Sequence, residues 1–423
     1  MSAGAPAASV GAVHPPLFGP LYVAFAAGYL LSYLFRTVNA VISPELTRDL
    51  ALEPGSLGLL TSAYFVAFAA MQIPVGMLLD RYGPRRVEPV LLAVAALGAL
   101  AFALADGLPA LTVGRAIIGA GVSACLMAPL KGIAMWYPPE RHASYAGWVM
   151  VAGGVGALVA TIPVEMALRV ATWREIFVAL AALTLAVAVW MWLRVPDTPK
   201  PSHATGFAAQ WAGVTQVFRH PRFWWIAPLG GFAMGAFMAI QGLWAVPWMM
   251  EVEGMTRAAA AGHLLVMGVA ILAGYLVLGV FGTRLNRRGI RPRHLFAAGF
   301  GLNVAAMALI VLRAPAGAVW WTLYGLGAAV NVLAFAVLNE GFPRELVGRA
   351  NTAVNLVMFA GSFAAQWGIG VVVDLLRAWH GFDTATGLRY AFACVLALEL
   401  CTIAWFALGW KRFAIHVPAQ AAA

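Results

Sequence analysis

Twelve stretches of this chain are apolar over about 20 residues, the length that a helix needs to cross the hydrocarbon core of a membrane. They cover residues 18–43, 56–79, 87–105, 109–132, 144–168, 175–194, 222–250, 260–283, 294–312, 317–340, 350–376 and 388–410. In lipid, every backbone polar group must be satisfied within the protein, so each stretch is expected to be helical. The sequence therefore predicts an all-α integral membrane protein with twelve transmembrane helices.

The composition supports the same class. Hydrophobic residues make up 62% of the 423 residues and charged residues only 10%, whereas an ordinary soluble domain is roughly a quarter charged. The net charge of +10 does not indicate nucleic-acid binding, because the basic residues lie in short loops between the apolar stretches. Cys125, Cys394 and Cys401 lie in apolar stretches without CxxC spacing, so neither a disulfide framework nor a zinc site is predicted.

The distribution of Lys and Arg predicts the orientation. With both termini in the cytoplasm, 17 of the 27 basic residues fall on the cytoplasmic side, seven fall on the opposite side and three lie within spans. Cytoplasmic loops of membrane proteins carry such an excess of basic residues. We therefore expect a multi-pass membrane protein with both termini in the cytoplasm. The membrane that we expect it to occupy is the bacterial inner (plasma) membrane.

A polar, proline-rich segment divides the chain into two similar halves. Residues 195–221 contain PDTPKPSHATG, a composition typical of a linker. The segment 76–83 is echoed 206 positions later by the segment 282–289, with Asn286 in place of Asp80. We expect two pseudo-symmetric six-helix bundles, at 1–195 and at 222–423 with a short cytoplasmic tail, joined by a cytoplasmic loop at 196–221. Such a repeat places a transporter's substrate site near the midplane, between the halves.

The loop after the second span has the pattern GxxxDRxGxRR, formed by Gly76, Asp80, Arg81, Gly83, Arg85 and Arg86. It resembles the signature loop of the major facilitator superfamily, and its degenerate second copy holds Asn286 and Arg287. The resemblance implies the major facilitator fold, transport by alternating access, and a role for both loops as a conformational gate. A carboxylate and an arginine at helix ends can form a latch that breaks as the halves rock. The alternative is that these charges only set the orientation.

Two patterns in spans seven and eight predict a metal site. Met234 and Met238 are spaced i,i+4, as are His263 and Met267, so each pair lies on one face of its helix. Thioether ligands select Cu(I), and imidazole also binds it. Packing is the alternative explanation, because methionine often fills gaps in apolar cores.

The same two patterns resemble those of the CcoA-type copper importers of bacteria, a branch of the superfamily. This resemblance implies that Met234, Met238, His263 and Met267 bind copper as transported cargo, and the leading expectation is copper uptake. Ligation must then be weak enough for the ion to be released.

Three basic residues within the spans favour a different cargo. Arg36, Arg115 and Lys131 are costly in lipid and are functional candidates by default. Positive charges near a cavity would repel Cu(I) and attract an anion. Arg115 matches a family position linked with coupling or structure, and Lys131 could instead extend to the interface. The sequence thus leaves open a proton-coupled carrier of a small organic anion or vitamin that uses Arg36 and Arg115.

Other classes receive less support. The sequence has no Walker A or HExxH pattern, so neither ATP-driven transport nor an enzyme is predicted. We expect no cofactor, and the expected partners are the lipid bilayer and a small solute or metal ion, with the protein acting as a monomer. A membrane receptor on a transporter scaffold is a further alternative, which a soluble signalling domain would favour.

Overall fold

The computed structural model describes residues 19–136, 139–196, 207–339, 342 and 344–414. Every regular element in these residues is a helix. Eleven helical segments are long and apolar enough to cross a membrane, and the shorter apolar helix α4 (Leu108–Gly121) continues through a turn into α5 (Met127–Trp136) to form the remaining span. The predicted all-α, twelve-span architecture is confirmed.

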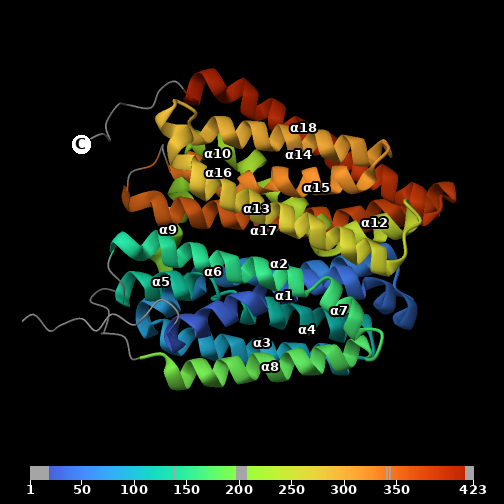
Figure 1. The fold of residues 1–423 in the computed structure, drawn as a ribbon, viewed down its shortest axis with the longest axis horizontal. Helices are drawn as coiled ribbons and strands as arrows, with labels where there is room; N and C mark the ends of the chain where they lie inside the picture. The colour runs from blue at the N-terminus through green and yellow to red at the C-terminus, as the bar shows by residue number, and fades with distance from the viewer. Residues whose placement is uncertain (1–18, 137–138, 197–206, 340–341, 343, 415–423) are drawn as a thin grey trace, which may run out of the picture.

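The first six spans form one bundle, the lower group of helices in Figure 1. Besides α4 and α5 it contains α1 (Pro20–Leu50), α2 (Pro54–Tyr82), α3 (Pro84–Leu104), α6 (Pro139–Val159), α7 (Ile162–Ala167) and α8 (Trp173–Arg194). Many of these helices begin at a proline, whose missing N–H would have no partner in a first turn. α8 begins with a capping box, in which the Thr172 side chain accepts from the Glu175 N–H and the Glu175 carboxylate accepts from the Thr172 N–H.

The other six spans form the upper group in Figure 1, and α9 (Phe207–Phe218) lies between the groups along the chain. This second bundle contains α10 (Pro221–Ala227), η1 (Pro228–Ala233), α11 (Met234–Ala239), η2 (Ile240–Trp244), α12 (Ala245–Glu251), α13 (Arg257–Arg287), α14 (Pro292–Val311), α15 (Gly317–Ala328), η3 (Ala329–Val332), α16 (Leu333–Asn339), α17 (Arg344–His380) and α18 (Thr384–Ala414). Residues 197–206 of the predicted linker and residues 415–423 of the predicted tail lie outside the described residues.

Three spans that the sequence predicts as continuous are interrupted. Span four turns at residues 122–126, where the Ser123 hydroxyl donates to the Ala120 carbonyl over 2.6 Å. Such a local side-chain bond competes with the helical ladder. Span ten narrows to the 3₁₀ segment η3, and span seven widens to π-helix at η1 and η2. Irregular turns of this kind often accompany functional sites.

The most extensive contact between the two bundles runs along α2 and α17. Glycines allow close approach from both sides, since a Cβ on Gly58 would lie 2.6 Å from the Gln366 carbonyl oxygen and one on Gly370 would lie 2.3 Å from that of Pro54. Further along the same pair of helices, the rings of Phe68 and Phe359 have centroids 4.4 Å apart. This line of contact brings residues far apart in sequence to the centre of the molecule.

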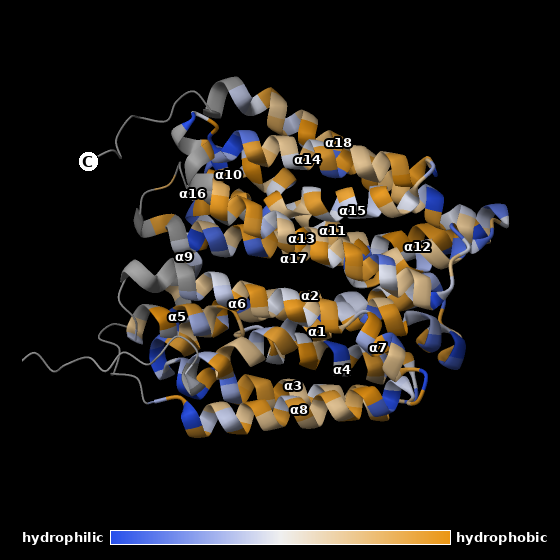
Figure 2. Cartoon of the chain, viewed as in Figure 1, coloured by the Kyte–Doolittle hydropathy of each residue, from blue (hydrophilic) through white to orange (hydrophobic). Residues whose placement is uncertain are grey.

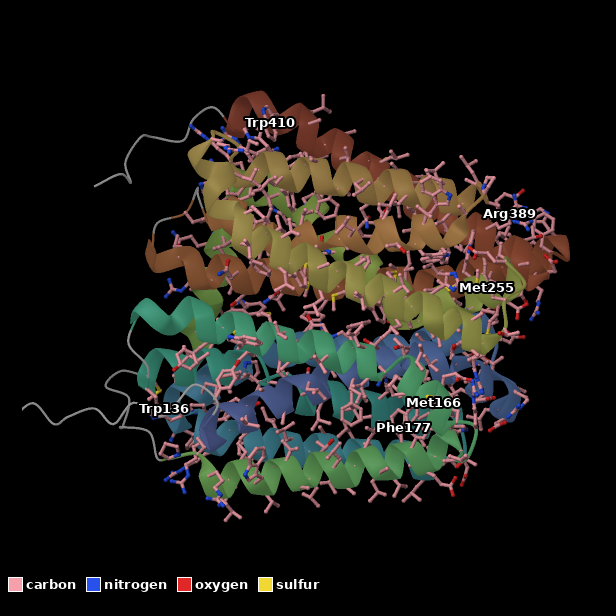
Figure 3. All side chains as sticks on the ribbon, viewed as in Figure 1. Trp136, Met166, Phe177, Met255, Arg389 and Trp410 are labelled. Atoms are coloured by element: carbon pink, nitrogen blue, oxygen red, sulfur yellow. The ribbon has the colours of Figure 1, made fainter. Side chains whose placement is uncertain are left out.

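Hydrophilic residues gather at the two ends of the helices, and hydrophobic residues cover most of their length (Figure 2). Trp136 and Trp410 lie towards one end, which we call the α9 end because α9 lies there, and Met255 and Arg389 lie at the other (Figure 3). We call the second end the Arg257 end, since α13 begins there at Arg257. An apolar belt between two polar ends is the distribution that a bilayer requires.

Candidate functional site

Arg36 lies on α1 at the interface between the two bundles. Its guanidinium carbon is 4.4 Å from the ring centre of Tyr33 on the same helix and 5.6 Å from that of Phe68 on α2. A third ring, Phe359 of α17, belongs to the other bundle and lies 5.9 Å away. Aromatic faces attract a cation, so residues of both halves hold the Arg36 side chain in one position.

The polar neighbours of Arg36 are hydroxyl groups. The Tyr64 hydroxyl interacts with the Arg36 guanidinium and donates to the Ser32 carbonyl over 3.4 Å. Tyr275 of α13 lies within electrostatic range of Arg36 and remains 37% exposed. Among the described residues no carboxylate forms an ion pair with Arg36, and its Nε atom has no hydrogen-bond partner. The interface therefore holds a positive charge that no acidic side chain in the described part of the chain neutralises.

Arg115 lies behind this site, on α4 of the first bundle. Its guanidinium carbon is 5.0 Å from the centre of the Tyr64 ring, and the residue is only 1% exposed. Its Nε and Nη1 atoms have no hydrogen-bond partner among the described residues. Tyr64 thus contacts both arginines, Arg36 through its hydroxyl and Arg115 through its ring.

The π-helical segment η2 of span seven packs directly against the backbone of α1 at this level. A Cβ on Gly242 would lie 3.4 Å from the Arg36 carbonyl oxygen. Two residues on, the Trp244 indole donates to the Gln366 carbonyl of α17 over 2.8 Å. The irregular part of span seven therefore contacts the helix that carries Arg36 and the helix that carries Phe359.

The four residues predicted to bind a metal have separate neighbours. The Met238 sulfur lies 3.8 Å from the Ser362 hydroxyl on α17, whereas Met267 packs against Gly325 of α15. The His263 Nδ1 atom lies 2.9 Å from the Ala259 carbonyl on its own helix, and Met234 is partly buried on α11. The structure thus directs Met238 and Met267 towards different helices, and no contact that it describes joins two of the four side chains.

The predicted gate residues lie at the α9 end. Asp80 on α2 forms an ion pair with Lys131 on α5, within the first bundle. Gly83 adopts a positive φ of 74° between α2 and α3, which a glycine tolerates without strain. The guanidinium of Arg81 lies 5.2 Å from the Tyr82 ring centre. Gly76 and Arg85 are partly buried and Arg86 is exposed, while the side chains of Asn286 and Arg287 on α13 are outside the described part of the chain.

Lys131 is one of the three intramembrane cations, and its partner explains its position. The Asp80–Lys131 pair connects the end of α2 to α5, the helix that follows the turn in span four. The structure therefore groups Lys131 with the gate residues and separates it from Arg36 and Arg115.

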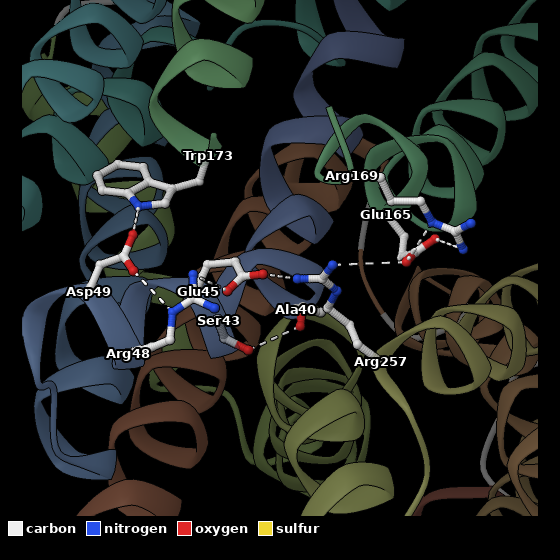
Figure 4. A network of polar contacts seen from close by, with 9 residues as sticks. All are labelled: Ala40, Ser43, Glu45, Arg48, Asp49, Glu165, Arg169, Trp173 and Arg257. Carbon is white, nitrogen blue, oxygen red and sulfur yellow. Dashed lines mark hydrogen bonds and ion pairs between the residues drawn. The ribbon is translucent and has the colours of Figure 1, made fainter. Parts of the chain in front are cut away.

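A second charged network lies at the Arg257 end and was not predicted from the sequence (Figure 4). Arg257 of the second bundle forms ion pairs with Glu45 of α1 and, at 3.9 Å, with Glu165 of α7. Glu165 also pairs with Arg169 at 3.0 Å, and Glu45 with Arg48 at 3.1 Å. These contacts join the two bundles on the side opposite to the Asp80 loop.

Two bundles of membrane-spanning helices that meet along a common interface are an architecture found in membrane transporters. The chain belongs to the Major Facilitator Superfamily, whose family model matches residues 25–366.

Several curated relatives are transporters. The chain is 24% identical over 300 residues to the probable sulfoacetate transporter SauU of Cupriavidus necator, covering 68% of this chain and 69% of that protein. It is 28% identical over 247 residues to the hexuronate transporter of Escherichia coli K12, covering 54% and 56%. It is also 25% identical over 431 residues to the tetracenomycin C resistance and export protein of Streptomyces glaucescens, covering 86% and 78%.

Among solved structures, the chain is similar to a bacterial homologue of the human lysosomal transporter Spinster in an inward-facing, unoccupied conformation. The TM-score is 0.74 at 18% identity, and the match covers 95% of this chain and 98% of the homologue. This similarity supports the major facilitator fold.

Proposed function

We propose that this protein is a secondary transporter of a small organic anion that works by alternating access, with Arg36 binding the anionic group. The observation that carries the proposal is the Arg36 guanidinium, which lies between the two bundles and pairs with no carboxylate among the described residues. An unpaired cation within a span is costly, and a cargo that supplies the negative charge removes that cost. The anionic substrates named for the sulfoacetate and hexuronate transporters support the same class.

In this proposal Tyr64 and Arg115 position Arg36. The Tyr64 hydroxyl restrains the guanidinium from one side, and Arg115 holds the Tyr64 ring from behind. Phe359 brings the second bundle to the same site. An anion bound at Arg36 therefore contacts both halves, which is the position that alternating access requires.

Copper uptake, the leading expectation from the sequence, has weaker support. The relatives named above are a probable sulfoacetate transporter, a hexuronate transporter and a tetracenomycin C resistance and export protein. Met238 and Met267 face different helices, and a Cu(I) site needs converging soft ligands. The organic anion carrier, which the sequence left open as the alternative, accounts for the structure and the relatives better.

We further propose that the protein lies in the bacterial inner membrane as a monomer, with the α9 end in the cytoplasm. This orientation is supported because it places the excess of Lys and Arg on the cytoplasmic side. The Asp80–Lys131 pair then belongs to a cytoplasmic gate and the Arg257 network to a periplasmic one. Reporter fusions near residue 205 and at the C-terminus are expected to give cytoplasmic activity, and periplasmic activity at either site would reverse the orientation.

The cargo is tested by uptake into proteoliposomes that contain the purified protein. We expect uptake of radiolabelled galacturonate or sulfoacetate and no uptake of Cu(I). The Met238→Leu and Met267→Leu variants should retain anion uptake, because Leu and Met have similar volumes and such swaps usually cost less than about 1.5 kcal/mol. Cu(I) uptake that these two substitutions abolish would instead establish the metal transporter.

A further inference from the structure

Glu88 is a buried carboxyl group that the anion site does not use. It lies on α3, one turn after Pro84, and is 0% exposed. Neither carboxyl oxygen has a hydrogen-bond partner among the described residues. An isolated carboxylate is strongly disfavoured in an apolar interior, whereas the neutral acid is tolerated. In this conformation the environment of Glu88 therefore stabilises the form that carries a proton.

The neighbours of Glu88 come from several helices of the first bundle. A Cβ on Gly28 of α1 would lie 2.6 Å from the Glu88 Oε1 atom and 3.5 Å from the Met191 methyl group of α8. From the turn in span four, the Cys125 thiol faces the carboxyl group. Cys125 is the titratable group beside Glu88, and Arg36 also acts on this thiol electrostatically.

We propose that Glu88 is a proton-binding site that is coupled to anion binding at Arg36, so that the protein is a proton–anion symporter. The proposal rests on the proposed anion-carrier function. Glu88 packs against the backbone of α1 at Gly28, and Arg36 lies eight residues further along the same helix. A shift of α1 that accompanies anion binding changes the burial of the Glu88 carboxyl group and therefore its affinity for a proton. By thermodynamic linkage, proton binding at Glu88 changes the affinity for the anion by the same factor.

The balance of charge favours this coupling. A carboxylate at position 88 takes up one proton and becomes a neutral acid, and Arg36 takes up one negative charge with the anion. The anion and the proton are both released on the other side of the membrane, where the Glu88 carboxyl group returns its proton to water. For a monoanion such as galacturonate, one proton travels with one cargo molecule and no net charge crosses.

Glu399 provides a matched control in the second bundle. It lies on α18, is 0% exposed, and its two carboxyl oxygens also lack partners among the described residues. The titratable group that it affects is Tyr324 of α15, in the second bundle. Glu399 is thus as buried as Glu88, but no contact connects it to Cys125 or Arg36.

The test compares Glu88→Gln and Glu399→Gln in proteoliposomes with the membrane potential clamped at zero. A gradient of one pH unit corresponds to about tenfold accumulation of a monoanion that moves with one proton. We expect the wild type and Glu399→Gln to approach about tenfold accumulation of galacturonate. Glu88→Gln should stay near onefold but retain galacturonate exchange, which shows that it is folded and binds cargo. Tenfold accumulation by Glu88→Gln would overturn the proposal.

A second measurement needs neither a variant nor transport. A hydrophobic carbodiimide reacts with protonated carboxyl groups in apolar surroundings, and peptide mass spectrometry identifies the labelled residue. We expect Glu88 and Glu399 both to be labelled in the wild type, with galacturonate changing the rate at Glu88 alone. Labelling of Glu399 without Glu88 would overturn the proton site. A wild type that labels at Glu88 but shows no galacturonate exchange would instead contradict the proposed cargo.

Discussion

The guanidinium carbon of Arg115 lies 5.0 Å from the centre of the Tyr64 ring, deep in the first bundle. The opposite end of the same tyrosine holds Arg36 through its hydroxyl group. The buried Arg115 and the partly buried Arg36 would repel each other in a low-dielectric interior. Tyr64 separates them while interacting favourably with both, which places Arg115 as a support and leaves Arg36 to face the second bundle.

Tyr64→Phe tests this arrangement, because it keeps the ring against Arg115 and removes the hydroxyl that restrains Arg36. We expect galacturonate affinity to fall by about tenfold, equal to roughly 1.4 kcal/mol, with little change in thermal stability. The control is Tyr324→Phe, since the Tyr324 hydroxyl has no partner among the described residues. Equal affinities for the two variants would contradict the role of Tyr64.

Gly370→Ala tests the close contact of α2 with α17. A Cβ at this position would lie 2.3 Å from the Pro54 carbonyl oxygen, whereas one on Gly368 of the same helix meets nothing within 4 Å. Overpacking costs about 1–3 kcal/mol, so Gly370→Ala should lower the Tm in detergent. Gly368→Ala should leave the Tm unchanged or raise it, because alanine stabilises a helix relative to glycine by roughly 0.5–1 kcal/mol. A similar Tm for both variants would show that the halves are not packed as described.

Arg257→Gln tests the network between the bundles in Figure 4. It removes the pairs with Glu45 and Glu165 that join the two halves. The Arg257 and Glu45 side chains are partly exposed, so we expect the free-energy difference between the conformers to change by roughly 1 kcal/mol, or about fivefold in their populations. Hydrogen exchange should accelerate in α7 and in the first turn of α13.

Arg169→Gln is the control for that measurement. Arg169 also pairs with Glu165, at 3.0 Å, but both residues belong to the first bundle. This variant should not open the contact between the halves. If Arg169→Gln accelerates exchange in α13 as much as Arg257→Gln does, the network does not act as a gate.

Asp80→Asn tests the gate predicted from the sequence. The substitution weakens the pair with Lys131 at the α9 end without touching the anion site. We expect the initial rate of galacturonate uptake to fall by about fivefold, in line with roughly 1 kcal/mol for a partly exposed pair, while binding affinity stays unchanged. Asp49→Asn, which affects the bond to Trp173 at the other end, serves as the control. Unchanged uptake by Asp80→Asn would show that the charges of this loop only set the orientation of the protein in the membrane.

The sequence was sufficient for the fold because the apolar stretches match the thickness of a bilayer. Apolar length does not reveal the turn at 122–126 in span four, where Ser123 and close helix packing compete with the helical ladder. The π-helical segments of span seven likewise depend on contacts with α1 and α17.

The site was only partly predictable. Arg36 and Arg115 stood out because charges within spans are rare, but Tyr64, Phe68 and Phe359 are ordinary membrane residues until the fold brings them together. The methionine patterns correctly place each pair on one face of a helix, yet spacing within one helix cannot show which neighbour that face meets. Glu88 was missed because it lies beside the charged loop, and only packing shows that its carboxyl group is isolated.

The central claim is that Arg36 binds the anionic group of the cargo. The most direct test is equilibrium binding of galacturonate to the purified wild type, Arg36→Gln, Arg36→Lys and Met238→Leu proteins. Truncating one partner of a buried charge pair costs about 2–5 kcal/mol, so Arg36→Gln should bind at least about 30-fold more weakly. Arg36→Lys should retain part of the affinity and Met238→Leu all of it. Wild-type affinity in Arg36→Gln, or loss of binding in Met238→Leu alone, would contradict the account.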